Sequence, residues 1–458
     1  MRRFFVVVLL LIVAATAAIW FCPASFGYRY LMKPSKTVTL SDLSGTIWNG
    51  HAGSISVRDR ALGQLDWHLR FKPLLEGRRV ADFAISGDAL KTQGTLTKSP
   101  TGNTFDNLSF SLPAHTAAEM LQVKAKAEGD IEGSAASLTV LDGWPTQLRD
   151  GKARWIKAKL ADTELGTVET TFDAAADGNI AGKVKNTGGG AQFDGALKLK
   201  PTRDLELNDF TFKLPASLAT ALLGQPNANA AGTIDGKLVH ILLRTGTAPA
   251  EARGNLRWND AATAAVSHEL LGNVDATFDT AADGGIAGTL KNDGGHAQLA
   301  AKWKLGAGHA LELTDATLKF PATLLAPLIR LPGIEVGGDV DGNFARLTLR
   351  ESLWPSAIAG KLVWHGVTVS GVRQAALGDM EWSLGTDPDG SIIGVIGDLG
   401  GPLQVNGTFK TTKTSYDAAV QLSARGGDPA IAAALRKIGT PQADGSTIVQ
   451  ANGEFGKK

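Results

Sequence analysis

Four acidic residues recur along the chain at nearly equal intervals and are the first candidates for chemistry. Each closes a Leu-Gly-x-apolar-acid pattern, and the four are Asp66, Glu169, Asp275 and Glu381. Two carboxylates held close together can act as a general acid and a general base. These acids come from separate copies of one pattern, however, so they are better interpreted as the polar face of equivalent strands. We therefore expect no catalytic pair among them.

Other residue types that carry chemistry are present without the spacing that the chemistry needs. The eight histidines are scattered, and none lies in a cluster with metal-ligand spacing. The sequence has no Gly-x-x-x-x-Gly-Lys-Ser/Thr phosphate loop and no Gly-x-Ser-x-Gly nucleophile elbow. Three tryptophans recur at one position and could stack a ligand, but tryptophans in strands more often fill a core. We expect no catalytic site, no cofactor and no metal site.

Composition narrows the class of protein further. The 46 Lys and Arg residues balance 45 Asp and Glu residues, for a net charge of +1, which argues against a nucleic-acid binder. Glycine is abundant, at 54 residues, and separates runs in which apolar and polar residues alternate. That pattern is typical of many short strands joined by tight turns. Cys22 is the single cysteine, which excludes an intramolecular disulfide.

The elements that would position these residues repeat along the chain. The Leu-Gly pattern begins at Leu62, Leu165, Leu271 and Leu377, at offsets of 103, 106 and 106 residues. Four further signatures recur with it: Gly-x-x-x-Trp at Gly151, Gly254 and Gly360; Gly-x-apolar-acid-Gly at Gly129, Gly232 and Gly338; Asp-Gly at Asp177, Asp283 and Asp389; and a proline before an Ala/Leu-rich stretch at Pro113, Pro215, Pro321 and Pro429. The recurrence predicts four tandem modules, at residues 35–127, 128–230, 231–336 and 337–458.

Each module is expected to consist of antiparallel strands followed by one short helix. The Asp-Gly pairs predict tight hairpin turns in which glycine supplies a positive φ. The Gly-Gly pairs at Gly188, Gly294 and Gly400 predict the next turn or a bulge. The segment Leu205–Leu214 alternates on either side of Asn208-Asp209, which predicts a hairpin, and Leu311–Phe320 is its counterpart. Each proline fits the first turn of a short helix, over 216–223, 322–329 and 430–438. The fold class is therefore mainly β: an elongated, curved antiparallel sheet of tandem modules with short helices between them.

The N-terminus predicts a membrane anchor. Arg2 and Arg3 lie in a tail of residues 1–3, and an uncharged apolar run follows at 4–21, close to the minimum length for crossing a bilayer. The arginines favour the cytoplasmic side, so the bulk of the chain is expected in the periplasm. A cleaved signal peptide is the alternative, because Ala15-Thr16-Ala17 offers a small-x-small site. The bulky Trp20 and Phe21 before Cys22 disfavour a lipoprotein.

One segment after the anchor resembles a known family. Leu43-Ser44-Gly45-Thr46-Ile47-Trp48-Asn49-Gly50 is followed by Leu62-Gly63-Gln64-Leu65-Asp66-Trp67 and by Pro73-Leu74-Leu75. Together with the anchor, this resembles protein N of the type II secretion system, mainly over residues 1–80 and more loosely to about residue 230. The chain is longer than members of that family usually are. The residues that carry the motif are Leu43, Ser44, Gly45, Trp48, Gly50, Leu62, Gly63 and Trp67.

The resemblance implies a function and its location. It implies a bitopic inner-membrane accessory component, not an enzyme, that supports protein export across the outer membrane. Its partners would be other secretion-system components at the inner membrane and in the periplasm, with no nucleic acid. The resemblance extends to AsmA-like periplasmic proteins, and the alternative function is therefore a conduit for lipid between the two membranes.

Overall fold

The computed structural model describes residues 21–31, 38–57, 60–99, 102–120, 125–222, 229–244, 249–264, 266–306, 310–325, 335–350, 352–370 and 375–454. The tail at 1–3 and residues 4–20 of the expected anchor lie outside these ranges. Among the described residues, no helix has both the length and the apolarity needed to cross a membrane. The chain divides into two compact units: unit 1 comprises Met1–Pro226 and Lys237–Ala250, and unit 2 comprises Asn227–Gly236 and Glu251–Lys458.

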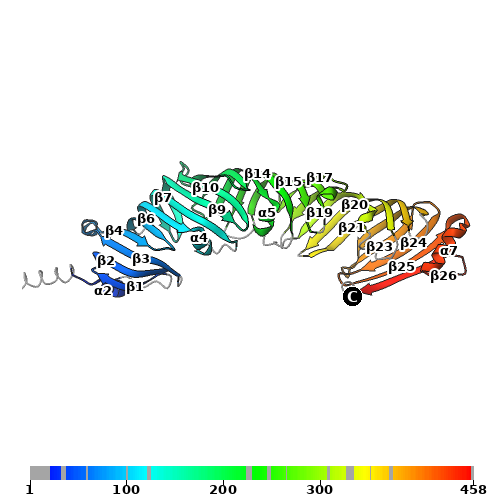
Figure 1. Ribbon diagram of the computed structural model, residues 1–458, viewed down its shortest axis with the longest axis horizontal. Helices are drawn as coiled ribbons and strands as arrows, with labels where there is room; N and C mark the ends of the chain where they lie inside the picture. The colour runs from blue at the N-terminus through cyan, green and yellow to red at the C-terminus, as the bar shows by residue number, and fades with distance from the viewer. Residues whose placement is uncertain are drawn as a thin grey trace, which may run out of the picture. The chain divides into compact units, whose positions relative to one another are not determined.

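Unit 1 is built from short helices and antiparallel strands (Figure 1). Its strands are β1 (Val38–Gly45), β2 (Asn49–Val57), β3 (Arg60–Leu69), β4 (Arg79–Ser86), β5 (Lys91–Ser99), β6 (Gly102–Pro113), β7 (Ala127–Leu141), β8 (Trp144–Arg149), β9 (Gly151–Leu160), β10 (Thr163–Ala174), β11 (Ile180–Thr187), β12 (Gln192–Leu199) and β13 (Leu205–Pro215). Its helical segments are α2 (Ala24–Phe26), η1 (Gly27–Leu31), α3 (Phe71–Leu75), α4 (Ala114–Met120) and α5 (Ala216–Leu222).

Neighbours in the sequence of unit 1 are neighbours in its sheet. Each strand from β1 to β7 pairs with the next, and so does each strand from β9 to β13. β7 is long enough to pair with β8 along one part and with β9 along another. Strand β14 (Ala231–Leu243) spans the boundary between the two units.

Unit 2 follows the same rule. Its strands are β15 (Pro249–Ala262), β16 (Gly272–Thr280), β17 (Ile286–Gly294), β18 (Gln298–Leu305), β19 (Leu311–Pro321), β20 (Glu335–Arg350), β21 (Ser352–Ser370), β22 (Ala375–Thr386), β23 (Ile392–Asp398), β24 (Leu403–Thr411), β25 (Ser415–Ala424), β26 (Thr440–Pro441) and β27 (Thr447–Glu454). Its helical segments are α6 (His268–Leu271), η4 (Ala322–Leu325), η5 (Arg425–Gly427) and α7 (Pro429–Ile438). The strands pair in sequence order up to β25, which pairs with β27.

The expected fold class is confirmed in its essentials. The described residues are mainly β, every pairing named above is antiparallel, and the helices are few and short. The elongated, curved arrangement of the modules, and their boundaries, stay predictions.

The predicted hairpin at Leu205–Leu214 is wrong. β13 runs through this segment as one strand, and Asp209 (φ 47°) lies in a bulge where the pairing with β12 shifts register. β19 has the same feature at Asp315 (φ 49°). A type I′ turn needs positive φ at two consecutive residues, whereas here Asp209 and Asp315 have it and the residue before each does not.

The Asp-Gly turns are confirmed. Gly178, Gly284 and Gly390 have φ values of 79°, 81° and 82°, and the amide of each donates to the carbonyl three residues earlier. At the Gly-Gly pairs, Gly188, Gly294 and Gly400 have the expected positive φ, and Gly294 is the last residue of β17.

Helical segments follow all four prolines, as expected, but the prolines differ in position. Pro429 opens α7, whereas Pro113, Pro215 and Pro321 are the last residues of strands. The alanine after each of these three prolines is almost fully buried, at 0–1% exposure. Only residues 322–325 of the helix expected at 322–329 lie in the described part of the chain, and they form a 3₁₀ turn.

Candidate functional site

The family-like motif forms the first tight turn of unit 1. β1 ends at Gly45, and the Thr46 amide donates a 2.8 Å hydrogen bond to the carbonyl of Asn49, the first residue of β2. Gly45 has a φ of 77°, and a Cβ built on it would lie 2.4 Å from that carbonyl oxygen. Glycine is therefore required here for both conformation and space.

The two halves of the motif meet across the β2–β3 pair. Gly50 is the register partner of Trp67, and a Cβ on Gly50 would lie 2.0 Å from Cζ2 of the Trp67 ring. The indole Nε1 of Trp67 donates to the carbonyl of Ile47 at 3.2 Å. The glycine in the first half therefore makes room for the tryptophan in the second.

Trp48 packs this turn against the neighbouring helix α3. Its side chain is 7% exposed, and its ring meets that of Phe71 edge-on, with centroids 5.5 Å apart. The Ile47 amide donates to the Cys22 carbonyl at 3.0 Å, and Thr46 forms an isolated bridge with Pro23. The chain that follows the expected anchor is thus fixed directly against the motif.

Leu62 and Gly63 form a second close approach. Leu62 is 4% exposed, and Gly63 has a φ of 144°. A Cβ on Gly63 would lie 2.5 Å from the carbonyl oxygen of Ser86 and 2.8 Å from the Cα of Gly87. The Leu-Gly pattern therefore marks a place where two backbones touch.

Seven of the eight motif residues have a role in packing or backbone geometry. Leu43 is half-buried and pairs with the fully buried Ala52, and Ser44 alone in the set projects an exposed side chain. The structure brings both halves of the motif together, as described above. A contact of these residues with a partner stays a prediction.

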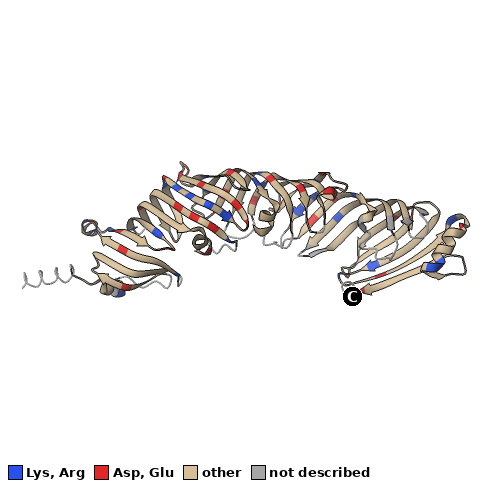
Figure 2. Cartoon of the chain, viewed as in Figure 1, with Lys and Arg blue, Asp and Glu red and all other residues tan. Residues whose placement is uncertain are grey.

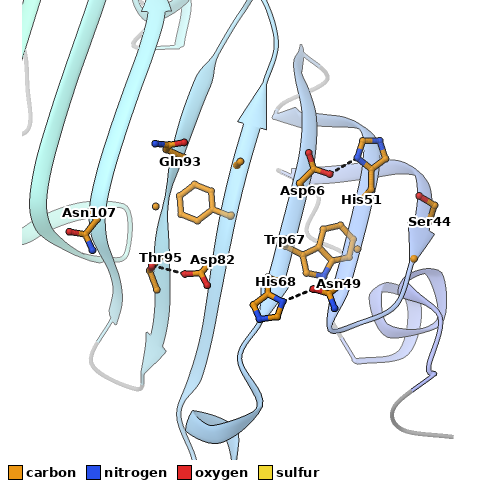
Figure 3. Close-up of a pocket in the computed structure, with 15 residues that line it drawn as sticks. Ser44, Asn49, His51, Asp66, Trp67, His68, Asp82, Gln93, Thr95 and Asn107 are labelled. Carbon is orange, nitrogen blue, oxygen red and sulfur yellow. Dashed lines mark hydrogen bonds and ion pairs between the residues drawn. The ribbon is translucent and has the colours of Figure 1, made fainter. Parts of the chain in front are cut away.

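A shallow concavity of about 670 Å³ lies over this motif. Figure 3 shows its polar side chains, which come from β1 to β6. Many of them stand in one register row that continues from β2 to β7, namely Asn49, His68, Asp82, Thr95, Asp106 and Ser137. Within this row His68 hydrogen-bonds Asn49, Thr95 donates to Asp82 at 2.7 Å and Ser137 donates to Asp106 at 2.7 Å.

Asp82 is the most perturbed acid of this concavity. The guanidinium of Arg70 donates two hydrogen bonds to its carboxylate, at 2.7 and 2.9 Å. This pairing holds the pKa of Asp82 below its usual range, and the same contact raises the pKa of Arg70. Asp82 is therefore a fixed negative charge and is unsuited to donating a proton near neutral pH.

Ser44, His51 and Asp66 have the residue types of a catalytic triad on three adjacent strands. They are register partners, and His51 Nδ1 lies 2.8 Å from Asp66 Oδ1. The Asp66 side chain is 60% exposed, whereas the acid of a working triad is buried. Among the hydrogen bonds of the described residues, none joins Ser44 to His51, and a nucleophile needs that contact to lose its proton.

The next copy of the repeat explains this triplet. Glu132, Arg154 and Glu169 occupy the corresponding register positions, and Arg154 lies 3.5 and 3.4 Å from the two acids. In unit 2, Arg257 pairs with Asp275 at 2.9 Å. The recurring acids are therefore partners in cross-strand ion pairs, and Figure 2 shows charges of both signs interspersed on the strands around β9 and β10.

Each of the recurring tryptophans makes an equivalent hydrogen bond in its own copy of the repeat. The indole groups of Trp155, Trp258 and Trp364 donate to the carbonyls of Glu128, Ala231 and Gly337, at 2.9, 2.7 and 3.0 Å. Each acceptor precedes a bulge glycine with a φ between 93° and 106°. The indole thus satisfies a carbonyl that the bulge removes from the strand ladder.

Sequence reasoning missed a pair of asparagines. The side-chain amide of Asn186 donates to the carbonyls of Leu165 and Ala191, and Asn292 makes the same two contacts in the next copy. The signal was available, because both lie two residues before a Gly-Gly pair. In the last copy Asp398 occupies this position and forms an ion pair with Arg425.

Within the described part of the chain, no group of three His, Cys, Asp or Glu side chains is arranged to hold a metal ion.

Comparison with known proteins identifies the family. The sequence model described as "Type II secretion system (T2SS), protein N" matches three times, at residues 36–206, 176–314 and 300–450. The type II secretion system protein N of Vibrio cholerae serotype O1 is 28% identical over 166 residues, which cover 34% of this chain and 65% of that relative. No solved structure matches the chain. Because the family's matches extend over most of the sequence, the chain belongs to the protein N family of type II secretion systems.

Proposed function

We propose that the chain is an inner-membrane accessory component of the type II secretion system. In this proposal residues 4–21 anchor it in the membrane, and the strands lie in the periplasm, where they support protein export across the outer membrane. The observation that carries the proposal is the threefold family match over residues 36–450. Membership of this family implies a place in the cell envelope and a role in secretion, not an enzyme.

The same proposal treats residues 35–127, 128–230, 231–336 and 337–458 as repeating modules. The recurrence of one contact supports this division: an indole donates to the carbonyl before a bulge glycine near residues 128, 231 and 337. The arrangement suits a component that offers similar surfaces several times along its length.

We further propose that the concavity over β1–β6 contacts another secretion component. Its rows of exposed hydroxyl, amide, imidazole and carboxylate groups provide donors and acceptors of the kind found at protein interfaces. Gln93 is a suitable position to test, because its side chain is exposed and lines the concavity.

The test is secretion by cells that lack the gene. We expect the deletion to reduce export of folded periplasmic proteins while the lipid composition of the outer membrane stays unchanged, and the full chain should restore export. Gln93→Arg should restore it poorly, whereas Gln192→Arg, a matched exposed glutamine on β12, should restore it fully. Normal export in the deletion strain would refute the function, and equal rescue by the two variants would refute the contact surface.

A second candidate function is a conduit for lipid, and one observation favours it. The strands of unit 1 have an apolar face whose side chains are only half-buried, and one register row on it comprises Leu69, Ala81, Leu96, Phe105, Leu138 and Leu148. Unit 2 has a comparable row at Trp303, Leu313, Leu347 and Ile358. Partly exposed apolar surface of this kind suits a lipid chain.

Bound phospholipid and the effect of gene deletion distinguish the two candidate functions. A lipid conduit should carry several phospholipid molecules per chain, and its deletion should leave secretion intact and the outer membrane short of lipid. A secretion component without bound lipid should show the opposite pattern.

A further inference from the structure

The connection between β3 and β4 exposes apolar side chains at its tip. It consists of α3 (Phe71–Leu75) and a turn to Arg79, and we call residues 71–79 the α3 turn. Leu75 is 74% exposed, Phe71 44% and Leu74 38%. Single exposed apolar residues are ordinary on a protein surface, but three within five residues form a patch that needs an explanation.

Cations surround this apolar tip. Lys72, Arg78 and Arg79 are all exposed, against the single acid Glu76, which forms an ion pair with Arg78. Apolar side chains flanked by Lys and Arg are typical of segments that lie in the boundary between the headgroups and the acyl chains of an anionic bilayer. A polar protein surface as partner would leave the exposed apolar side chains unexplained. A purely apolar partner would leave the surrounding cations unexplained.

The α3 turn is held in place before any partner arrives. The Phe71 ring packs against the buried Trp48, and the Leu69 amide donates to the Trp48 carbonyl at 2.7 Å. The turn is closed by hydrogen bonds from Gly77 to Leu74 at 3.1 Å and from Arg78 to Pro73 at 2.9 Å. A preorganised turn loses little conformational freedom when it binds a surface.

The position of the α3 turn in unit 1 points to the same partner. Trp48 follows Ile47, whose amide donates a hydrogen bond to the carbonyl of Cys22. The chain after the proposed anchor and the base of the α3 turn are therefore attached to the same short segment. α2 and the start of β4 lie at the same end of unit 1 (Figure 1).

From this charge pattern and placement, we infer that the α3 turn lies against the surface of a bilayer that contains anionic lipid. Leu74 and Leu75 enter the headgroup boundary, while Lys72 and Arg79 face the lipid phosphates. This second contact fixes the orientation of unit 1 on the membrane, which a single anchoring helix cannot do. The inference rests on the membrane location proposed above, but it does not depend on any secretion partner.

The experiment uses the full chain reconstituted into vesicles, with Cys22→Ser so that one new cysteine carries a polarity-sensitive fluorophore. Leu75→Cys places the fluorophore on the α3 turn. Leu222→Cys, at the end of α5 in the same unit and 54% exposed, is the matched control. The vesicles contain phosphatidylethanolamine with or without phosphatidylglycerol, together with a nitroxide lipid that quenches fluorophores near the bilayer surface.

We expect strong quenching at position 75 in the vesicles with phosphatidylglycerol and none at position 222. Replacing Lys72 or Arg79 by Gln should lower the ratio of membrane-bound to unbound α3 turn about fivefold for each charge removed. Lys183→Gln, an exposed lysine on β11, should have no effect, and an unchanged strand-dominated circular dichroism spectrum would show that each variant is folded.

The inference would be overturned by equal quenching at positions 75 and 222, by quenching that does not depend on phosphatidylglycerol, or by a chain that does not float with the vesicles. If the fluorescence at position 75 changes only when other envelope proteins are added, the α3 turn binds a protein partner, and this result would also overturn the inference. The vesicles contain no secretion component, so failure here leaves the secretion assay unaffected, and the reverse also holds.

Discussion

Replacing Trp364 by alanine tests whether the recurring tryptophans belong to the core. Trp364 is 6% exposed and packs with Ala322, Val340 and Val367. Its ring stacks on that of Trp382, with centroids 5.8 Å apart and an interplanar angle of 24°. Alanine would remove all of these contacts together with the hydrogen bond to the Gly337 carbonyl.

The expected cost of Trp364→Ala follows from these contacts. Truncation of a buried tryptophan costs about 3–5 kcal/mol. Part of this is the hydrogen bond, since the net contribution of one is about 1 kcal/mol and an unsatisfied buried carbonyl costs more. Trp364→Phe keeps one six-membered ring in the core but loses the five-membered part of the indole and its N–H donor, so it should cost less than alanine, about 1–3 kcal/mol.

The measurement is amide hydrogen exchange of the full chain, followed by mass spectrometry. The loss should be local to β20–β22, because these strands pair directly with one another. A loss of 3 kcal/mol corresponds to exchange that is faster by about a hundredfold. Trp258→Ala, at the equivalent position but with a half-buried ring, should have a smaller effect on β15 and β16.

The alternative is that these tryptophans stack a ligand. Unchanged exchange in β20–β22 of Trp364→Ala, together with loss of a bound ligand, would refute the core interpretation. Equal effects of Trp364→Ala and Trp364→Phe would instead refute the reasoning about ring packing.

Two further predictions concern the motif turn and one of the Asp-Gly turns. Gly50→Ala should lower the thermal unfolding temperature, because its Cβ collides with the Trp67 ring, whereas Gly397→Ala should not, because no atom lies within 4 Å of its Cβ. Equal unfolding temperatures would contradict the close approach. The pKa of Asp177 is lowered to about 2, chiefly by its hydrogen bond with Lys198. The stability that this carboxylate contributes is therefore fully present above its unfolded pKa of about 3.9. That stability is lost as the pH falls from about 4 to about 2. Lys198→Ala should raise the pKa of Asp177 in an NMR titration, and an unchanged titration would show that the pairing is absent in solution.

The recurring sequence signatures predicted most of the local structure correctly. The Asp-Gly turns at Asp177 and Asp283, and the short helix after Pro215, depend on interactions within a few residues of the chain. Glycine has no Cβ and can adopt a positive φ whatever surrounds it, so the spacing of glycines in the sequence predicts where the turns lie. The family motif was also recognisable, because it is contiguous.

The tertiary structure decided which distant residues meet. Gly50 and Trp67 are far enough apart in sequence that only the register of β2 and β3 shows why one must be small. The bulge at Asp209 replaced the expected hairpin because pairing with β12 continues on both sides of it. Register likewise converted the recurring acids into ion-pair partners, and tertiary packing placed Phe71 of α3 against Trp48. A period-two pattern determines that a segment is a strand, but its neighbours are determined by hydrogen bonds to other strands, which the local sequence does not encode.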